Sequence, residues 1–370
     1  MNILELCLTG GLGGLEVYVF RISRALSNNH NVSVITSGKL LEHFRQHSDI
    51  KTTHIDCLFR PLPLFSAYKL ARYIDNNKID IVHAHWTKDL PLVALAKILS
   101  QRKPKLIFTR QMDITRRKND FYHKMQYSQV NLFLTITEQL AESCRRFIGN
   151  DFKGKIKTLY HGVPEPDKFL TSDEISMQRS SLGIGSNDFL VGLFGRLERG
   201  KGQHLLIEAI ALAKNDGIKL KALIVGHEMT AGYRQTLKTL AKNLGVDNHV
   251  IFHDFVNDPQ SLMQLCDCVA LTTYNETFGL VLPEAMRAGI AVIGSNRGGV
   301  PEIIDHNSTG LLFEPINPSS LYKQLNRLYN EPNLRQQLAD NGKRMADIKF
   351  NDETHFNKLE EYMLNILEKQ

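Results

Sequence analysis

The chain has 370 residues, a net charge of +6, 42% hydrophobic and 23% charged residues. Its length exceeds that of one typical core, so we expect two domains of roughly 150–200 residues. The composition is that of a soluble globular protein, and no apolar run approaches the ~18 residues of a membrane span. No export signal is visible, and the five cysteines form no Cys-x-x-Cys pair. We therefore expect reduced thiols in a cytoplasmic protein and no structural zinc.

Strands and helices alternate along the first half. Residues 3–8 form an apolar strand, a glycine-rich loop follows at 9–14, and apolar residues recur at helical spacing over 17–26. Further strands are predicted at residues 32–35, 79–82, 106–108 and 132–136. This alternation predicts a parallel sheet with right-handed crossovers.

The same pattern restarts after a polar stretch that ends near residue 188. Strands are predicted at residues 189–194, 220–225, 250–252, 269–271 and 291–294. The predicted fold class is therefore α/β, with two doubly wound Rossmann-like domains facing across a cleft. We assign residues 1–165 to the first domain, 166–351 to the second, and a terminal helix at about 352–370 to a crossing back onto the first. Ligands bind such sheets at the carboxyl ends of strands, so the cleft is the expected site.

Two glutamates follow the strand predicted at 269–271. Glu276 and Glu284 stand eight positions apart, Gly279 permits close backbone approach, and Pro283 fits the first turn of a helix. A helix start can bind phosphate, whereas a carboxylate accepts hydrogen bonds from a sugar diol. Together these features predict a nucleotide-sugar ligand; the alternative is an ordinary acidic helix start favoured by the helix dipole.

Two cations follow the strand predicted at 189–194. Arg196 and Lys201 stand five positions apart among glycines, where they could neutralise a diphosphate. Breaking a sugar–phosphate bond builds negative charge on the leaving nucleotide, and prearranged cations stabilise that charge. The alternative is a basic loop that caps a helix. The loop does not match the Gly-x-x-x-x-Gly-Lys-Ser/Thr pattern of nucleotide triphosphatases.

The two motifs, Gly-Arg-x₄-Lys-Gly at 195–202 and Glu-x₇-Glu at 276–284, resemble those of retaining glycosyltransferases of family 4, which have the GT-B fold. Matches at residues 13–16, 161–163 and 298–302 extend the resemblance along nearly the whole chain, although an Asn is more usual at His161. The resemblance extends to bacterial lipopolysaccharide and polysaccharide glycosyltransferases.

The resemblance implies a role for each matching residue. Arg196 and Lys201 would hold the donor diphosphate, and Glu284 would bind the ribose hydroxyls. Glu276 would hold the transferred sugar and its phosphates. The remaining implied donor contacts are the backbones of Gly13, Gly14, Phe278, Gly279 and Leu280. Arg196, Lys201 and Glu276 are the expected catalytic residues.

One position departs from the family pattern. Family members usually carry a His where this chain has Gln111 or Arg110. Gln cannot act as a base, but it can orient a sugar. In retaining transfer the departing phosphate oxygen can itself take the acceptor proton.

The expected acceptor contacts lie in the first half. His83 and His85 alternate onto one face of a strand without a nearby third metal ligand, and His85 is nearer the strand's carboxyl end. A packed or hydrogen-bonded histidine is the alternative. The acceptor-binding residues are predicted to be Glu16, His85, Gln111 and Asp113. Because no Asp-x-Asp occurs, we expect no metal and no other cofactor.

The first half is basic. Residues 101–160 hold 13 Lys and Arg against 5 Asp and Glu. This predicts a surface that meets anionic lipid headgroups or an acidic acceptor, unless it is simply a solvated face. Nucleic acid is not expected, because the cluster lacks interleaved aromatics on a recognisable binding motif.

The expected function is transfer of a sugar with retained configuration from a nucleoside-diphosphate sugar, with a UDP-sugar as the expected donor, to a glycan or lipid-linked acceptor. The expected setting is lipopolysaccharide, O-antigen or capsule synthesis at the inner face of the cytoplasmic membrane. Three alternatives stay open: a GT-B-type sugar-nucleotide epimerase, a degenerate transferase that acts as a binding partner, and a nicotinamide dehydrogenase. Glu16 stands where the dehydrogenase fingerprint needs a third Gly, which weakens the last of these.

Overall fold

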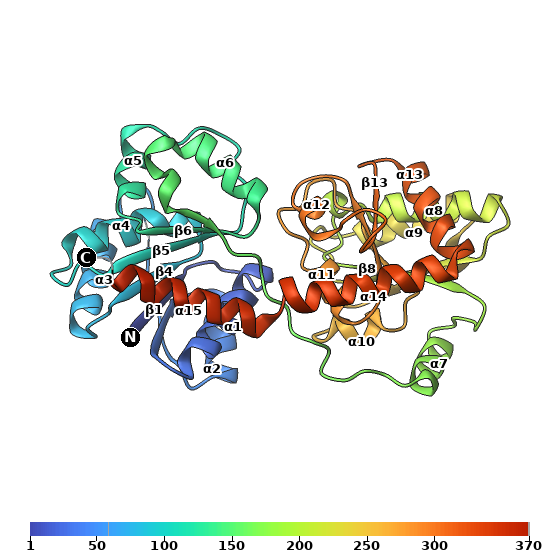
Figure 1. Ribbon diagram of the computed structural model, residues 1–370, viewed down its shortest axis with the longest axis horizontal. Helices are drawn as coiled ribbons and strands as arrows, with labels where there is room; N and C mark the ends of the chain where they lie inside the picture. Colours follow the sequence, from blue (N-terminus) through green and yellow to red (C-terminus); the bar gives the residue numbers. More distant parts are fainter. Residues whose placement is uncertain (58, 369–370) are drawn as a thin grey trace. The chain divides into compact units, whose positions relative to one another are not determined.

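The computed structural model describes residues 1–57 and 59–368. It divides into two compact units (Figure 1). Unit 1 comprises Met1–His161 and Glu353–Gln370, and unit 2 comprises Gly162–Asp352. Each unit contains one parallel sheet with helices, which confirms the predicted pair of Rossmann-like α/β domains. Within the described residues, no helix is both long and apolar enough to cross a membrane.

The sheet of unit 1 has the strand order β3-β2-β1-β4-β5-β6-β7, with every pair parallel. Its strands are β1 (Asn2–Cys7), β2 (Asn31–Thr36), β3 (Lys51–Thr53), β4 (Ile81–Ala84), β5 (Lys105–Arg110), β6 (Leu132–Thr135) and β7 (Ile156–Thr158). The edge strands β3 and β7 were not predicted. Each has only three residues and lacks an apolar run, so neither carries the usual strand signal.

Helices pack on both faces of this sheet. They are α1 (Gly14–Ser27), α2 (Gly38–His47), α3 (Leu64–Asn76), α4 (Leu90–Leu99), α5 (Phe121–Ser128), α6 (Glu138–Ile148) and α15 (Asp352–Glu368), with 3₁₀ turns η1 (Thr87–Asp89) and η2 (Asn150–Lys155). On β1, Leu4 packs in the core with α3 and α4, whereas its neighbour Ile3 packs with α1 and α15. This alternation is the period of two expected of a buried strand. The C-terminal α15 contributes Leu359 and Met363 to the second of these cores.

The sheet of unit 2 has the order β10-β9-β8-β11-β12-β13, also parallel throughout. Its strands are β8 (Phe189–Phe194), β9 (Leu220–Val225), β10 (Val250–His253), β11 (Cys268–Leu271), β12 (Ala291–Ser295) and β13 (Leu311–Phe313). Its helices are α7 (Ser172–Ser181), α8 (Gln203–Asn215), α9 (Tyr233–Asn243), α10 (Pro259–Met263), α11 (Val281–Arg287), α12 (Val300–Ile303), α13 (Pro318–Asn330) and α14 (Pro332–Lys349), with 3₁₀ turns η3 (Arg199–Lys201) and η4 (Asp247–His249).

Both sheets reverse their strand order at one point. In unit 1 the reversal lies between β1 and β4, and in unit 2 it lies between β8 and β11. Ligands of doubly wound sheets bind outside the carboxyl ends of the strands at this switch point. The loops that follow β8 and β11 carry the Arg/Lys and Glu/Glu motifs. The fold therefore places both motifs where such a sheet binds its ligand.

Candidate active site

The loop after β8 is held against the end of β11. Gly202 has φ 73°, and a Cβ at this position would lie 2.4 Å from the Thr272 carbonyl oxygen. Only glycine permits this backbone conformation without strain and this approach without a clash. The Thr272 hydroxyl donates a hydrogen bond of 2.8 Å to the Lys201 carbonyl. The glycine of the motif therefore brings its lysine to the neighbouring strand.

The two motifs meet in an ion pair. Lys201 Nζ lies 2.7 Å from Glu276 Oε2, and the two side chains are 23% and 21% exposed. Arg196 is exposed and pairs with Glu198 at 3.2 Å. The structure thus brings two of the predicted catalytic residues into contact and leaves the third on the same loop, paired with a neighbour that the sequence analysis did not identify.

The loop that carries Glu276 is fixed by a second close approach. Gly299 N donates a hydrogen bond of 2.8 Å to the Glu276 carbonyl. Gly298 has φ 67°, and a Cβ there would lie 2.2 Å from the same oxygen. The glycines of the 298–302 motif therefore act on Glu276 through its backbone.

The predicted helix start is present but short. Phe278 is buried and packs edge-on against Phe350 at 5.7 Å, and Gly279 has φ 92°. Leu280 caps α11, and the half-buried Glu284 lies in its opening turn. Because α11 has only seven residues, its dipole is smaller than that of a long helix.

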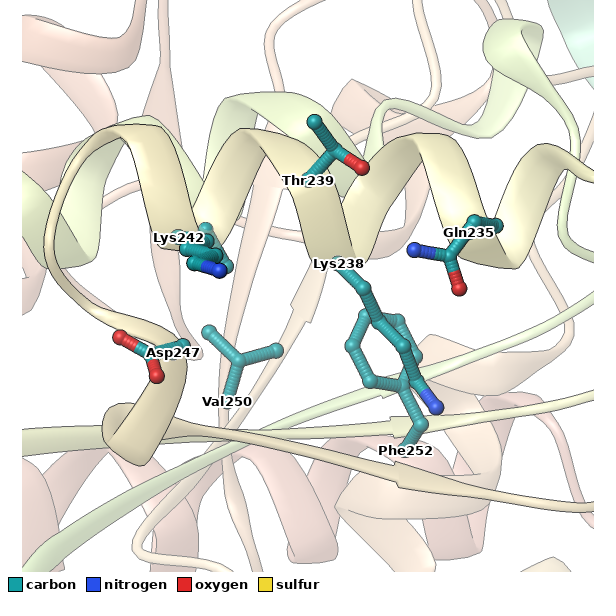
Figure 2. Close-up of a pocket in the computed structure, with 8 residues that line it drawn as sticks. Gln235, Lys238, Thr239, Lys242, Asp247, Val250 and Phe252 are labelled. Carbon is teal, nitrogen blue, oxygen red and sulfur yellow. The ribbon is translucent and has the colours of Figure 1, made fainter.

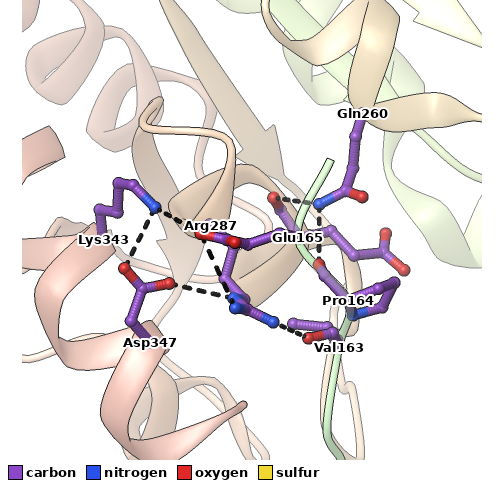
Figure 3. Close-up of polar contacts among 8 residues, drawn as sticks. Val163, Pro164, Glu165, Gln260, Arg287, Lys343 and Asp347 are labelled. Carbon is purple, nitrogen blue, oxygen red and sulfur yellow. Dashed lines mark hydrogen bonds and ion pairs between the residues drawn. The ribbon is translucent and has the colours of Figure 1, made fainter. Parts of the chain in front are cut away.

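A buried arginine at the end of α11 ties this helix to its surroundings (Figure 3). Arg287 Nε lies 3.0 Å from Asp347 Oδ1 of α14, and its Nη1 donates to the Val163 carbonyl. Lys343 also contacts Asp347, at 3.1 Å. The Val163 amide donates to the Phe350 carbonyl at 2.8 Å. These contacts attach the segment that begins at Val163 to α11 and α14. They also fix the position of α11, the helix that carries Glu284.

The glycine loop of unit 1 opens α1. Gly13 and Gly14 are exposed, and Gly13 N donates a hydrogen bond of 2.8 Å to Glu16 Oε2. Glu16 is only 8% exposed, because its carboxylate folds back over the start of its own helix. The structure therefore shows Glu16 as a local cap of α1, and its acceptor contact stays a prediction.

His83 and His85 share a buried carboxylate. Glu5 on β1 lies 3.2 Å from His83 Nδ1 and 2.6 Å from His85 Nε2, and all three side chains are buried. The expectation that no third ligand lies near the histidines is wrong, because β1 pairs with β4 and brings Glu5 beside His83. The 2.6 Å contact is a hydrogen-bond distance, shorter than the separation of two ligands bound tetrahedrally at ~2 Å to a zinc ion.

Burial and neighbouring charges shift the pKa values of Glu5 and His85. Burial alone would raise the pKa of Glu5, but the charges and hydrogen bonds of His83 and His85 lower it to about 2. Burial and the neighbouring His83 lower the pKa of His85 to about 4, against the opposing effect of Glu5. The cluster therefore holds an ionised Glu5 and a neutral His85 near pH 7.

The predicted acceptor residues after β5 lie on an irregular loop. Gln111 is half-buried, and its buried Nε2 has no hydrogen-bond partner in the described part of the chain. Asp113 is exposed, and its carboxylate accepts from Ile114 N at 2.7 Å. Arg110 precedes this loop and is buried at the last position of β5.

A surface pocket of about 290 Å³ lies between α9 and β10 (Figure 2). It is lined by Gln235, Lys238, Thr239, Ala241, Lys242, Asp247, Val250 and Phe252. None of these residues belongs to the motifs predicted to bind the donor. The pocket is at the edge strand of the sheet rather than at its switch point.

Two families of glycosyltransferases match the chain. Glycosyltransferase Family 4 matches residues 12–165, and Glycosyl transferases group 1 matches residues 174–345. The first match covers most of unit 1 and the second covers most of unit 2, including both charged motifs.

Relatives and solved structures agree with these matches. The chain is 28% identical to the uncharacterized glycosyltransferase MJ1607 of Methanocaldococcus jannaschii, over 90% of this chain and 89% of that protein. It is 23% identical to the capsular polysaccharide biosynthesis glycosyltransferase CapM of Staphylococcus aureus, over 90% and 89%. It is also 23% identical to N-acetyl-alpha-D-glucosaminyl L-malate synthase of Bacillus anthracis, over 96% and 95%.

Among solved structures, Anabaena HepE in complex with UDP aligns with a TM-score of 0.87 and 25% identity, over 99% of this chain and 100% of that one. WaaG, a glycosyltransferase involved in lipopolysaccharide biosynthesis, shares the fold with a TM-score of 0.71 at 17% identity, over 98% of this chain and 99% of that one. The chain is therefore a family 4-like glycosyltransferase of the GT-B fold.

Proposed function

We propose that the protein transfers a hexose, with retained configuration, from a UDP-sugar to a glycan or lipid-linked acceptor. The observation that carries this proposal is the Lys201–Glu276 pair, which joins the loops after β8 and β11 at the switch point of unit 2. Arg196 lies on the first of these loops, and Glu284 lies at the start of the helix after the second.

These residues suit the breaking of a sugar–phosphate bond. Lys201 would exchange Glu276 for the donor diphosphate, which carries more negative charge, and Arg196 would add a second cation. As the bond from sugar C1 to the phosphate oxygen breaks, the new bond from C1 to the acceptor oxygen forms on the same face. The acceptor proton passes to the departing phosphate oxygen, so the reaction needs no base at Gln111. Glu276, released from the lysine, can bind sugar hydroxyls.

We propose that this reaction needs no divalent cation. Arg196 and Lys201 already supply two positive charges for the leaving diphosphate. The chain has no Asp-x-Asp motif to hold a metal against phosphate. Addition of EDTA should leave transfer unchanged.

The proposed donor and acceptor classes are supported by similarity. HepE was crystallised with UDP and with UDP-glucose, which supports a uridine nucleotide. CapM and WaaG are named for capsule and lipopolysaccharide synthesis, which supports an acceptor in those polymers or in O-antigen. The N-acetyl-alpha-D-glucosaminyl L-malate synthase of Bacillus anthracis is named for a small organic acid, so relatives of this chain differ in acceptor.

Exposed apolar side chains support a place at the inner face of the cytoplasmic membrane. Phe121 is 86% exposed and Phe65 is 71% exposed. Tyr122 donates to the Pro61 carbonyl, so the start of α5 lies beside the segment before α3. Arg116 and other basic residues precede α5 in the chain. Exposed aromatics next to basic residues are typical of surfaces that rest on anionic lipid. Co-sedimentation with liposomes should rise with anionic lipid content, and insensitivity to it would count against this location.

A thermal-shift screen over nucleotides and nucleotide sugars tests the donor proposal. A ligand at 100 times its dissociation constant should stabilise the protein by about 2.7 kcal/mol. The Glu284→Ala variant should lose most of this shift, whereas Gln111→Ala should keep nearly all of it. Conversion of the donor sugar without transfer would instead indicate an epimerase. If no nucleotide shifts the wild-type protein, the chain is not a working transferase.

A further inference from the structure

Arg110 is a buried cation without an acidic partner. Its side chain is only 3% exposed. Its Nη2 donates to the Asp113 carbonyl at 2.9 Å and its Nη1 lies 3.4 Å from the Thr87 hydroxyl, while its Nε has no hydrogen-bond partner within residues 1–57 and 59–368. Among the ion pairs of the described residues, none involves Arg110. A buried charge is normally paired, so this one needs an explanation.

Arg287, which is also buried, has the carboxylate partners that a buried arginine normally has. The Arg287 side chain is 6% exposed, and it contacts the carboxylates of Asp347 at 3.0 Å and Glu165 at 3.9 Å. Arg110 is buried to a similar degree but has only one neutral carbonyl and one distant hydroxyl. Burial lowers the pKa of the Arg110 guanidinium, and the nearby Cys144, Tyr127 and Asp113 oppose this effect.

Unused donors gather in the same region. Tyr127 Oη is buried and has no hydrogen-bond partner among the described residues. Tyr127 interacts electrostatically with Arg110, and burial raises the pKa of Tyr127 to about 12, so its hydroxyl stays protonated. Arg110 and the neighbouring Tyr127 therefore offer N–H and O–H groups that no acceptor in the described chain takes. A surplus of donors around a cation is the chemistry of an anion site.

The position of Arg110 in the sheet suits a substrate contact. It is the last residue of β5, and it reaches Thr87, which follows the neighbouring β4. β4 borders the switch point of unit 1, where doubly wound sheets bind ligands. The side chain therefore lies at the ligand-binding edge of unit 1.

We propose that Arg110, together with Tyr127, binds an anionic group of the acceptor, either a phosphate or a carboxylate. This inference rests on the proposed transferase function, because it assigns the charge of the second substrate. A guanidinium binds either group with two parallel hydrogen bonds. The group would replace the Asp113 carbonyl and the Thr87 hydroxyl as the partners of Arg110. The acceptor would thus be recognised by its charge beside the hydroxyl that receives the sugar.

Stability measurements without added anion give the first test. If Arg110 is kept for a ligand, Arg110→Met removes an unpaired buried charge, and the melting temperature should stay the same or rise. Arg287→Met is the matched control, because it removes a paired buried arginine; it should lower the melting temperature by roughly 6 °C or more. A comparable loss in Arg110→Met would show that Arg110 is structural and would overturn the proposal.

Anion titration gives the second test. Inorganic phosphate and malonate are titrated at constant ionic strength and saturating UDP, and the arginine Nε–H signals are followed by NMR. The Arg110 signal, assigned from its absence in Arg110→Met, should shift with phosphate, malonate or both. The anion that shifts it identifies the group on the acceptor. Anion affinity is compared by calorimetry, because the variant lacks the Arg110 signal, and it should be about 10- to 100-fold weaker in Arg110→Met.

The two proposals fail in different ways. If UDP does not bind but the Arg110 signal still responds to anions, the donor assignment fails and the anion site stands. If UDP binds and neither anion moves the signal, the anion site fails alone. Loss of the UDP-induced thermal shift in Arg110→Met would place Arg110 in the donor site and would also overturn the inference.

Discussion

Replacing Lys201 by Met separates a catalytic cation from a structural ion pair. The lysine and Glu276 lie 2.7 Å apart, and both are about one-fifth exposed. An ion pair with this access to water contributes at most about 1 kcal/mol to folding. A cation placed on a departing diphosphate contributes far more, since loss of one such contact typically costs about 10²–10³ in rate, or roughly 3–4 kcal/mol. Lys201→Met should therefore reduce the rate much more than the stability.

Lys221 provides a matched control. It lies 2.8 Å from Asp188, with side-chain exposures of 18% and 19%, but it is on β9 away from the charged motifs. Lys221→Met should cost a similar amount of stability in urea unfolding and leave the rate unchanged. The assay is UDP release from a UDP-sugar without acceptor, which reports cleavage of the same C1–O bond. If Lys201→Met and Lys221→Met lose equal stability and both keep the wild-type rate, the catalytic role of Lys201 is wrong.

Three further predictions concern packing and pH. Arg287→Ala removes a buried side chain and its bonds to the Val163 carbonyl and to Asp347, which keeps Lys343, and should lower the free energy of unfolding by about 3 kcal/mol in urea titration; a loss below about 1 kcal/mol would contradict the anchoring role of this arginine. Gly298→Ala places a methyl group 2.2 Å from the Glu276 carbonyl at φ 67°, so it should cost roughly 1–3 kcal/mol and weaken UDP binding; unchanged UDP affinity would mean that this loop does not hold the donor. His85 has a pKa of about 4 when folded and 6.5 as its ordinary value, so the unfolded chain binds the extra proton between these values and stability falls as pH is lowered. The loss from pH 7 to pH 5 should be about 2 kcal/mol larger in wild type than in His85→Gln, and equal slopes would refute the assignment.

The central strands could be predicted from the sequence because they are buried on both sides. Residues 189–194 and 220–225 were predicted with the bounds of β8 and β9, since continuous apolar runs mark such strands. The edge strands β3, β7 and β13 were missed. Each has three residues, and its pairing comes from the neighbouring strand rather than from its own composition.

The site could be predicted only in part. The sequence predicted that Lys201 and Glu276 lie on loops at the carboxyl ends of strands of one sheet. In the structure the two side chains form an ion pair. The third member of the His83–His85 cluster, Glu5, was missed because 78 residues separate it from His83 and only strand pairing brings them together. The Arg287 anchor was missed for the same reason, because its partner Asp347 lies 60 residues later on α14.

The most direct test of the account is a crystal structure of the protein with UDP. We expect the diphosphate to lie within hydrogen-bond distance of Arg196 and Lys201, with Lys201 released from Glu276. The ribose hydroxyls should contact Glu284. Binding of UDP at the surface pocket between α9 and β10, with the Lys201–Glu276 pair intact, would contradict the account.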